Sequence, residues 1–162
     1  MTTARDIMTP DARCVSETDD LVTAARKMAE LDIGAMPICG QDKRLKGMLT
    51  DRDIVVKVLE QGRNPAECTA GELATGKPVT IGADDEAGEI LNTMSANQVR
   101  RLPVIDGHDL VGIVALADVG KALPDKPVGQ VLGAISARHM DRSGPPTSPS
   151  RPGSASPTAG WR

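Results

Sequence analysis

Two short stretches of the chain carry residue types that suit ligand chemistry. Residues 47–53 end an apolar strand and begin a helix, with Thr50 and Asp53 three positions apart. A Thr hydroxyl can cap a helix, and a carboxylate three residues on can reach back to the cap. Residues 112–118 repeat the pattern with Ala115 in the Thr position and Asp118 retained. The start of such a helix suits an anionic ligand, and the spacing equally fits a purely structural cap.

Arg100 and Arg101 form a second candidate group. A guanidinium fork matches the geometry of a phosphate, so this pair suits the mouth of a phosphate-binding cleft. The alternative is an exposed pair at the start of a strand, and the sequence leaves both interpretations open.

Catalytic chemistry is not indicated. No nucleophile lies beside a general base, no His-rich metal spacing occurs, and no Gly-x4-Gly-Lys phosphate loop is present. The motif carboxylates are better suited to accepting hydroxyl groups than to working as an acid and base pair. We therefore expect no enzyme activity and no catalytic cofactor.

Composition limits the remaining options. Among 162 residues there is no Phe or Tyr and a single Trp, so the core must be aliphatic and a bound base must lie against aliphatic side chains. The net charge of -3 argues against general nucleic-acid binding. No secretory signal and no apolar run of the roughly 20 residues that span a membrane is visible. These features predict a cytoplasmic protein without membrane contact.

An internal repeat predicts the elements that position these residues. A shift of 66 residues places Ala4 on Ala70 and Pro37 on Pro103, and a one-residue deletion then places Asp53 on Asp118. Each copy shows a strand, a helix, a hairpin and a closing helix, which makes two β-α-β-β-α units of an α+β fold. The expected ranges are strands 13–16 and 79–81, helices capped by Thr18 and Asp84, hairpins 35–49 and 102–114, closing helices 53–61 and 118–123, and short helices 4–8 and 70–74 capped by Thr3 and Thr69.

The repeat also predicts the domain boundaries. The first copy takes residues 1–62 and the second takes residues 63–124. Residues 125–140 hold an amphipathic helix, because apolar residues recur at 128, 131, 132 and 135 with helical spacing. Residues 141–162 are rich in Ser, Pro and Gly and are expected to form a disordered tail.

With these residues in place, the chain resembles a pair of CBS domains, also called a Bateman module. The resemblance lies in the two-fold repeat, in the steps Met36-Pro37-Ile38 and Leu102-Pro103-Val104, and in the two Gly-to-Asp stretches. It implies a pseudo-two-fold CBS pair that binds an adenosyl ligand such as AMP, ADP, ATP, S-adenosylmethionine or NAD between the copies. It further implies a regulatory role and association into homodimers.

The family pattern also implies two ligand sites. The first would use Thr50, Asp53 and the segment before Pro37, which includes Ile33, Ala35 and Met36. The second would use Asp118 and the segment before Pro103, which includes Arg100, Arg101 and Leu102, but it lacks the hydroxyl.

Cys14 and Cys39 form one further group, because the implied fold places their strands side by side in parallel. They could form a disulfide, share a metal, or be two small buried apolar residues. A cytoplasmic location favours reduced thiols. Cys68, His108 and His139 are dispersed and are expected at the surface or in linkers.

Taken together, the sequence predicts a non-enzymatic regulatory module that senses energy state or stress through an adenosyl ligand and acts on an unidentified protein. Two alternatives stay open. One is a stress-response interaction dimer that has lost its ligand, which Ala115 favours. The other is a module stabilised by a metal or disulfide at Cys14 and Cys39.

Overall fold

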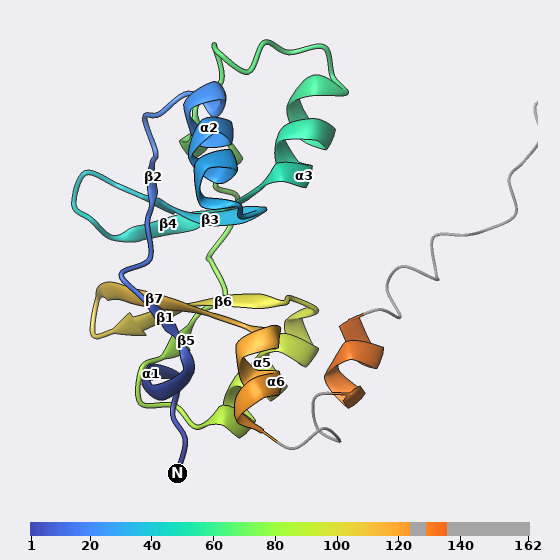
Figure 1. Cartoon of the computed structure of the whole chain (residues 1–162). Helices are drawn as coiled ribbons and strands as arrows, with labels where there is room; N and C mark the ends of the chain where they lie inside the picture. Colours follow the sequence, from blue (N-terminus) through green and yellow to red (C-terminus); the bar gives the residue numbers. More distant parts are fainter. Residues whose placement is uncertain (124–128, 136–162) are drawn as a thin grey trace, which may run out of the picture.

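The first copy forms a three-stranded sheet covered by helices on its outer side. The computed structural model describes residues 1–123 and 129–135. The sheet has the order β2 (Val15–Ser16), β3 (Ala35–Cys39) and β4 (Leu45–Thr50), with β2 parallel and β4 antiparallel to β3. Helix α2 (Leu21–Leu31) and helix α3 (Asp51–Ile54), which continues into the π-helix η1 (Val55–Leu59), lie on that outer side (Figure 1).

The second copy repeats this arrangement in a four-stranded sheet. Its order is β1 (Thr9–Pro10), β7 (Asp109–Ala115), β6 (Arg101–Asp106) and β5 (Ile81–Gly82). Helices α5 (Ala87–Asn97) and α6 (Leu116–Ala122) cover its outer side, so the two sheets face each other between two helix layers (Figure 1). The predicted α+β pair of β-α-β-β-α units is confirmed.

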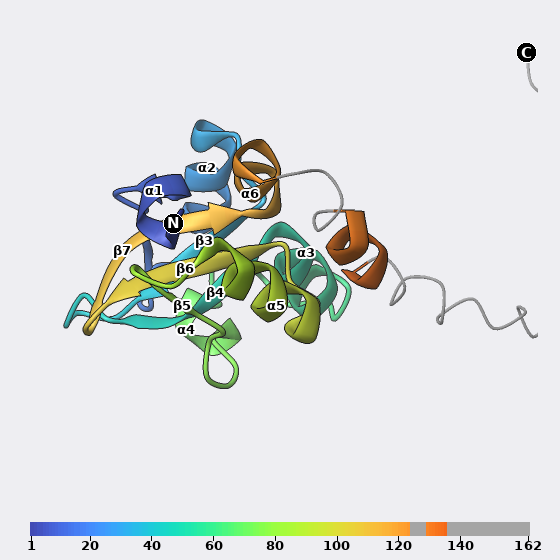
Figure 2. The same cartoon turned by 90° about the horizontal axis from the view of Figure 1, so that it is seen from below.

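The copies exchange their first segments. Helix α1 (Ala4–Ile7) and β1 belong to the second copy, because β1 pairs with β7 and Ala4 is buried in the second core. Helix α4 (Ala70–Leu73) packs in the first core and lies beside β4 (Figure 2). Equivalent backbone bonds hold both segments, since Ala4 N donates to Asp85 O at 2.8 Å and Ala70 N donates to Asp19 O at 2.9 Å. Packing therefore crosses the sequence boundary between residues 62 and 63.

The exchange explains the glycine that begins each motif. A Cβ added at Gly47 would lie 3.1 Å from Ala74 Cα, just after α4. A Cβ added at Gly112 would lie 2.7 Å from the Thr9 carbonyl oxygen. Real Cβ atoms essentially never approach backbone to 2.7 Å, so Gly112 is required where β1 crosses its strand, whereas the contact at Gly47 is tight but leaves room for a small adjustment.

The core is aliphatic, as predicted. The buried hydrophobic residues that the structure describes are Ala, Val, Leu, Ile, Met and Cys, and most of them fall into one cluster in each copy. Cys68 lies in the connection between the copies, which was one of its two expected positions, but it is 3% exposed and packs within the first cluster, not at the surface. Cys68 directly precedes α4, which packs in the first core, so the Cys68 thiol lies among apolar side chains.

Two predicted helix caps are wrong. Helix α2 begins two residues later than expected, with Asp20 as its N-cap and a 2.8 Å bond from Thr23 N to its carboxylate. The Thr18 hydroxyl instead bonds to Ser16 Oγ at 2.9 Å. In the second copy Glu86 stands at the N-cap position expected for Asp84, and its side chain makes no capping hydrogen bond. The Thr3 and Thr69 caps are confirmed.

A helix at 129–135 follows the second copy and lies within the predicted amphipathic segment. Val131 and Ile135 are 6% and 7% exposed in the second core cluster, so these two side chains pack on the module, whereas Leu132 is 45% exposed. The rest of the predicted amphipathic segment, 125–128 and 136–140, and the predicted tail 141–162 lie outside the described residues. In the part that is described, no helix combines the length and apolarity needed to cross a membrane.

Candidate functional site

Two clefts open between the facing sheets, and they are lined by equivalent positions of the two copies. We call them the Asp118 cleft, lined by Asp118, Ala115 and Ile113 with segment 9–13, and the Thr50 cleft, lined by Thr50, Met48 and Gly47 with segment 75–79. Their volumes are about 290 and 440 Å³. Pockets for drug-sized ligands have volumes of about 300–1,000 Å³, so both clefts are close to the lower end of the range that suits a small ligand such as a nucleotide.

Each cleft combines parts of both copies. Ile33 and Ala35, from the first copy, line the Asp118 cleft, whereas Val99 and Arg100, from the second copy, line the Thr50 cleft. The sequence groups each motif with the segment of its own copy, and in the structure each cleft also takes residues from the other copy's segment, with Ala35 and Arg101 lining both clefts. The facing of the two sheets accounts for this, because each motif ends a strand opposite the other copy's segment.

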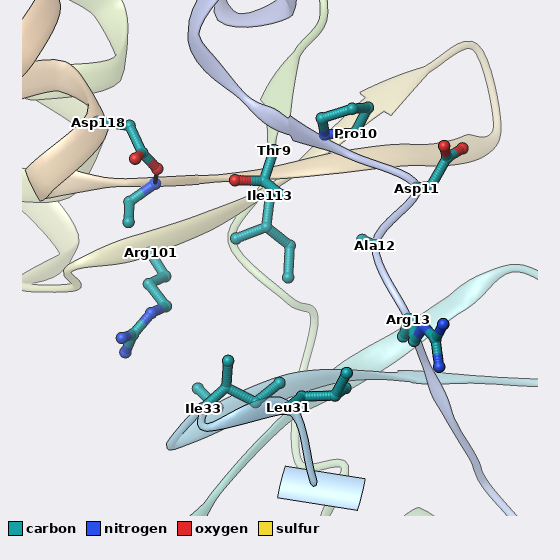
Figure 3. Close-up of a pocket in the computed structure, with 12 residues that line it drawn as sticks. Thr9, Pro10, Asp11, Ala12, Arg13, Leu31, Ile33, Arg101, Ile113 and Asp118 are labelled. Carbon is teal, nitrogen blue, oxygen red and sulfur yellow. Dashed lines mark hydrogen bonds between the residues drawn. The ribbon is translucent and has the colours of Figure 1, made fainter.

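The Asp118 cleft has an apolar slot with charged groups at its edge. Figure 3 shows Ile113 of β7 pointing toward Ile33 and Leu31 across the cleft. Arg101 of β6 extends into the same space, with its guanidinium directed away from Asp118 and toward the first copy (Figure 3). A flat apolar group could lie between the aliphatic side chains, with polar groups directed to Asp118 and Arg101.

Asp118 keeps one carboxylate oxygen free. Ala115 N donates to Asp118 Oδ2 at 3.0 Å, which is half of a capping box. Within residues 1–123 and 129–135, Oδ1 accepts no hydrogen bond and no cation lies within 4 Å of the carboxylate. This half-buried oxygen can accept a bond from a ligand hydroxyl.

The Thr50 motif forms the complete capping box that the sequence predicts. Asp53 N donates to Thr50 Oγ1 at 3.0 Å, and Thr50 N donates to Asp53 Oδ2 at 3.1 Å. Lys57 Nζ lies 2.8 Å from Asp53 Oδ1, so both carboxylate oxygens have partners. Asp53 is not among the lining residues of the Thr50 cleft.

The Lys57 ion pair also sets the ionisation of Asp53. Burial would raise the pKa of this carboxyl, but the Lys57 ammonium and the hydrogen bonds from Thr50 outweigh burial and hold the pKa below its usual value. Asp53 is therefore a fixed anion that is already neutralised. Ala122 occupies the position equivalent to Lys57 in the second copy, which leaves Asp118 without such a partner.

Of the other predicted site residues, Arg100 and Arg101 line a cleft, whereas the side chains of Met36 and Leu102 do not reach one. Arg101 lines both clefts, and Arg100 lines the Thr50 cleft. Met36 and Leu102 are fully buried in the two cores, so only their backbone can meet a ligand. Lys77 and Ile113 line the clefts and were missed by the motif search. The repeat could have found them, because Lys77 is the equivalent of Asp11 and Ile113 is the equivalent of Met48, and each of these lines the other cleft.

The structure joins Cys14 and Cys39 in a disulfide, with a Cα–Cα distance of 5.7 Å. Cys14 precedes β2 and Cys39 ends the parallel strand β3, as the implied fold requires. No set of three or more His, Cys, Asp or Glu residues in the described ranges is arranged to hold a metal ion. Cys14 follows Arg13, which lines the Asp118 cleft.

A family model identifies this architecture. The model of the CBS domain matches residues 4–60 and 70–125. The chain belongs to the CBS domain family. CBS domains are generally regulatory modules without catalysis of their own, many bind adenine nucleotides, and they often dimerise.

Known proteins extend the comparison for this CBS pair. Hypoxic response protein 1 of Mycobacterium tuberculosis is 53% identical over 135 residues, covering 83% of this chain and 94% of that protein. A crystal structure of Hypoxic Response Protein I with two coordinated zinc ions is 54% identical with a TM-score of 0.71, covering 76% of this chain and all of that one. CBSX2 in complex with AMP has a TM-score of 0.65 at 22% identity, covering 75% and 96%, and this likeness shows the fold alone.

Proposed function

We propose that this CBS pair is a regulatory module that binds an adenosyl ligand, of the AMP, ADP, ATP, S-adenosylmethionine or NAD type, in the Asp118 cleft. The observation that carries the proposal is the free Asp118 carboxylate oxygen at the edge of an aliphatic slot. The AMP complex of CBSX2 supports this ligand class through the shared fold.

The adenine ring would lie in the slot between Ile33 and Ile113. Both side chains are half-buried on opposite walls of the cleft, and no aromatic ring lines it (Figure 3). A flat ring between two branched aliphatic side chains gains dispersion contacts on both faces and loses contact with water. Binding of this kind needs no stacking partner.

The ribose and phosphate would meet the charged edge of the cleft. Asp118 Oδ1 would accept the ribose hydroxyls, and a hydrogen bond to a charged group contributes about 1.5–3 kcal/mol. Arg101, on β6 of the same copy, would donate to a phosphate. The prediction that Asp53 holds a ribose stays a prediction, and it requires Lys57 to release Oδ1.

Regulation would follow from the position of the ligand between the copies. A ligand held by Ile33 of one copy and Asp118 of the other changes the equilibrium between arrangements of the copies when it prefers one of them. A homodimer in the cytoplasm that senses energy or stress and acts on another protein is the setting we propose. The similarity to Hypoxic response protein 1 supports the stress role.

The test is isothermal titration of the full chain with AMP, ADP, ATP, S-adenosylmethionine and NAD(H). Asp118→Asn keeps the shape of the side chain and removes its charge, and we expect it to lower the affinity for the ligand at least tenfold. Asp109→Asn, an exposed change in β7, is the matched control and should leave affinity unchanged. Equal affinity of wild type and Asp118→Asn would refute the ribose contact. Absence of binding by every ligand would favour the ligand-free interaction dimer.

A zinc-binding function is the second candidate, because the 54% identical relative was crystallised with two coordinated zinc ions. The described residues of this chain do not fit a site within one chain, since the disulfide uses Cys14 and Cys39 and no cluster of three ligands exists there. Zinc titration of oxidised and reduced protein separates the cases. Uptake only after reduction would assign the metal to the two thiols.

A further inference from the structure

A short connection carries the chain from the second sheet to the first. Strand β1 lies in the second sheet and β2 in the first, and only residues 11–14 join them. Asp11 N still donates to Val111 O at 3.2 Å. In the part of the chain that the structure describes, Ala12 and Arg13 then make no backbone hydrogen bond. The backbone therefore holds this crossing only weakly.

Both ends of the crossing show that something else keeps it in place. Asp11 has a φ of 54°, in the left-handed region that residues other than glycine adopt uncommonly, and such a conformation persists where the surrounding structure enforces it. At the other end Cys14 is bonded to Cys39, which ends β3. The disulfide thus fixes the end of the crossing to the first copy, directly before β2 begins.

The crossing is also one wall of the Asp118 cleft. Residues 9–13 line this cleft, and Figure 3 shows Asp11, Ala12 and Arg13 following one another along one side of it. The Arg13 side chain is exposed, and among the described residues no carboxylate lies within 4 Å of it. The position of this wall therefore depends on the disulfide, which lies one residue beyond it.

A groove gives access to the disulfide from the surface. Cys14 and Cys39 both line it, and its volume is about 490 Å³. Cys14 is half-buried, whereas Cys39 is 7% exposed. Lys27 and Asp19 neutralise each other in the groove through a 2.7 Å ion pair, so Lys43 is the unbalanced charge of its described lining. A small anionic molecule is therefore attracted to the sulfur atoms.

We propose that the disulfide is a redox switch, which an anionic low-molecular-weight thiol opens through this groove. The thiolate attacks Cys14 Sγ, the more accessible sulfur, and a mixed disulfide forms as Cys39 leaves as a thiolate. A second thiolate attacks the sulfur of the small molecule and displaces the Cys14 thiolate. The two cysteines take up the two protons that the small thiols lost. Two electrons thus pass to the protein, and the small thiol leaves as its own disulfide.

Reduction releases residues 11–14 from the first copy. The wall of the Asp118 cleft then loses its order, and the affinity of this cleft for its ligand falls. In the cytoplasmic setting proposed above, a disulfide is typical of a redox sensor and not of a permanent brace. The effect on ligand affinity rests on the proposed function, whereas the release of the crossing does not.

The test is NMR relaxation of the full chain before and after treatment with reduced glutathione, an anionic thiol. Free thiols should increase from one to three. The order parameters of the Ala12 and Arg13 amides should fall from about 0.85 to below about 0.6, while those of α2 stay near 0.85. These parameters report motion within the folded state, so a general loss of stability does not change them.

Variants supply the controls. Cys14→Ser/Cys39→Ser should show the mobile crossing without glutathione, and Cys68→Ala, which removes the cysteine outside the disulfide, should respond like wild type. Lys43→Gln should slow reduction by glutathione at least threefold and leave reduction by the uncharged 2-mercaptoethanol unchanged. Lys121→Gln is the matched control, because this lysine is exposed and does not line the groove.

The outcomes separate this proposal from the adenosyl proposal. A crossing that stays ordered after reduction, or a disulfide that glutathione does not reduce in the folded protein, overturns the switch. If an adenosyl ligand binds, reduction should lower its affinity at least threefold, and an unchanged affinity refutes the link to the cleft. If no adenosyl ligand binds, the proposed function fails, and the order parameters still decide whether the switch exists.

Discussion

Ala115→Thr should stabilise the protein, because the second copy already has the backbone geometry of a capped helix start. Ala115 has φ -103° and ψ 155°, close to the -115° and 156° of Thr50. The bond from Ala115 N to Asp118 at 3.0 Å matches the bond from Thr50 N to Asp53 at 3.1 Å. The second copy lacks a side-chain oxygen that could accept a hydrogen bond from Asp118 N. Residue 115 lines a cleft, so the added atoms enter open space.

The expected size follows from measured caps. Exchange of a capping Thr and Ala changes stability by about 0.5–2 kcal/mol, and typically by about 1. A gain of about 1 kcal/mol raises the urea midpoint by roughly 0.3–1 M, since small proteins have slopes of about 1–3 kcal/mol per M. Thr50→Ala should lower the midpoint by a similar amount, because it removes the 3.0 Å bond from Asp53 N.

Equilibrium urea unfolding of four proteins tests this reasoning: wild type, Ala115→Thr, Ala115→Val and Thr50→Ala. Val has the shape of Thr without the oxygen, so it controls for packing and for the β-branched side chain. We expect only Ala115→Thr to have a higher urea midpoint than wild type. If Ala115→Val matches Ala115→Thr, the hydroxyl does not cap the helix and the argument from equivalent geometry is refuted.

Three further predictions follow from the described contacts. Because the pKa of Asp53 is held below its usual value, its stabilising contribution is present at neutral pH and disappears as pH falls through that lowered pKa; the stability difference between wild type and Asp53→Asn in urea should therefore shrink below about pH 4. Removing the disulfide with Cys14→Ser/Cys39→Ser should cost roughly 3 kcal/mol, from the 25-residue separation it closes, and reduced wild type should unfold like the variant; an unchanged midpoint on reduction would contradict the bond. Gly112→Ala should destabilise by about 1–3 kcal/mol through its contact with Thr9, whereas Gly88→Ala, with nothing within 4 Å, should not, and equal thermal midpoints would show that the crossing tolerates a methyl group.

Local signals in the sequence predicted the parts of the fold that depend on neighbouring residues. The Thr50 cap and the two hairpins follow from spacing and turn residues, and the structure contains them. Thr18 was wrong as a cap because Ser16 offered its hydroxyl a closer partner. Asp20 stands directly before the first apolar residue of the helix, so a stricter use of that rule finds the true cap.

The grouping of the site residues was not accessible in this way. A repeated unit has the same order of elements whichever copy its first helix packs on, so α1 and α4 carry no sequence signal of their exchange. The relation between Lys57 and Asp53 was likewise missed, although a four-residue spacing on a helix favours an ion pair. The set of residues that lines each cleft became visible only when segments from both copies were brought together.

The exchange of α1 and α4 makes the stability of each copy depend on the other half of the chain. A break in the 63–69 connection leaves an N-terminal fragment without α4 and a C-terminal fragment without α1, so each fragment has an open core. Such fragments should reassociate and recover the native fold when they are mixed. Because detaching either short helix uncovers apolar surface in the distant copy, the two copies should unfold in one cooperative transition. The amides of α1 should then resist hydrogen exchange as strongly as the sheet of the second copy, although they lie at the beginning of the chain.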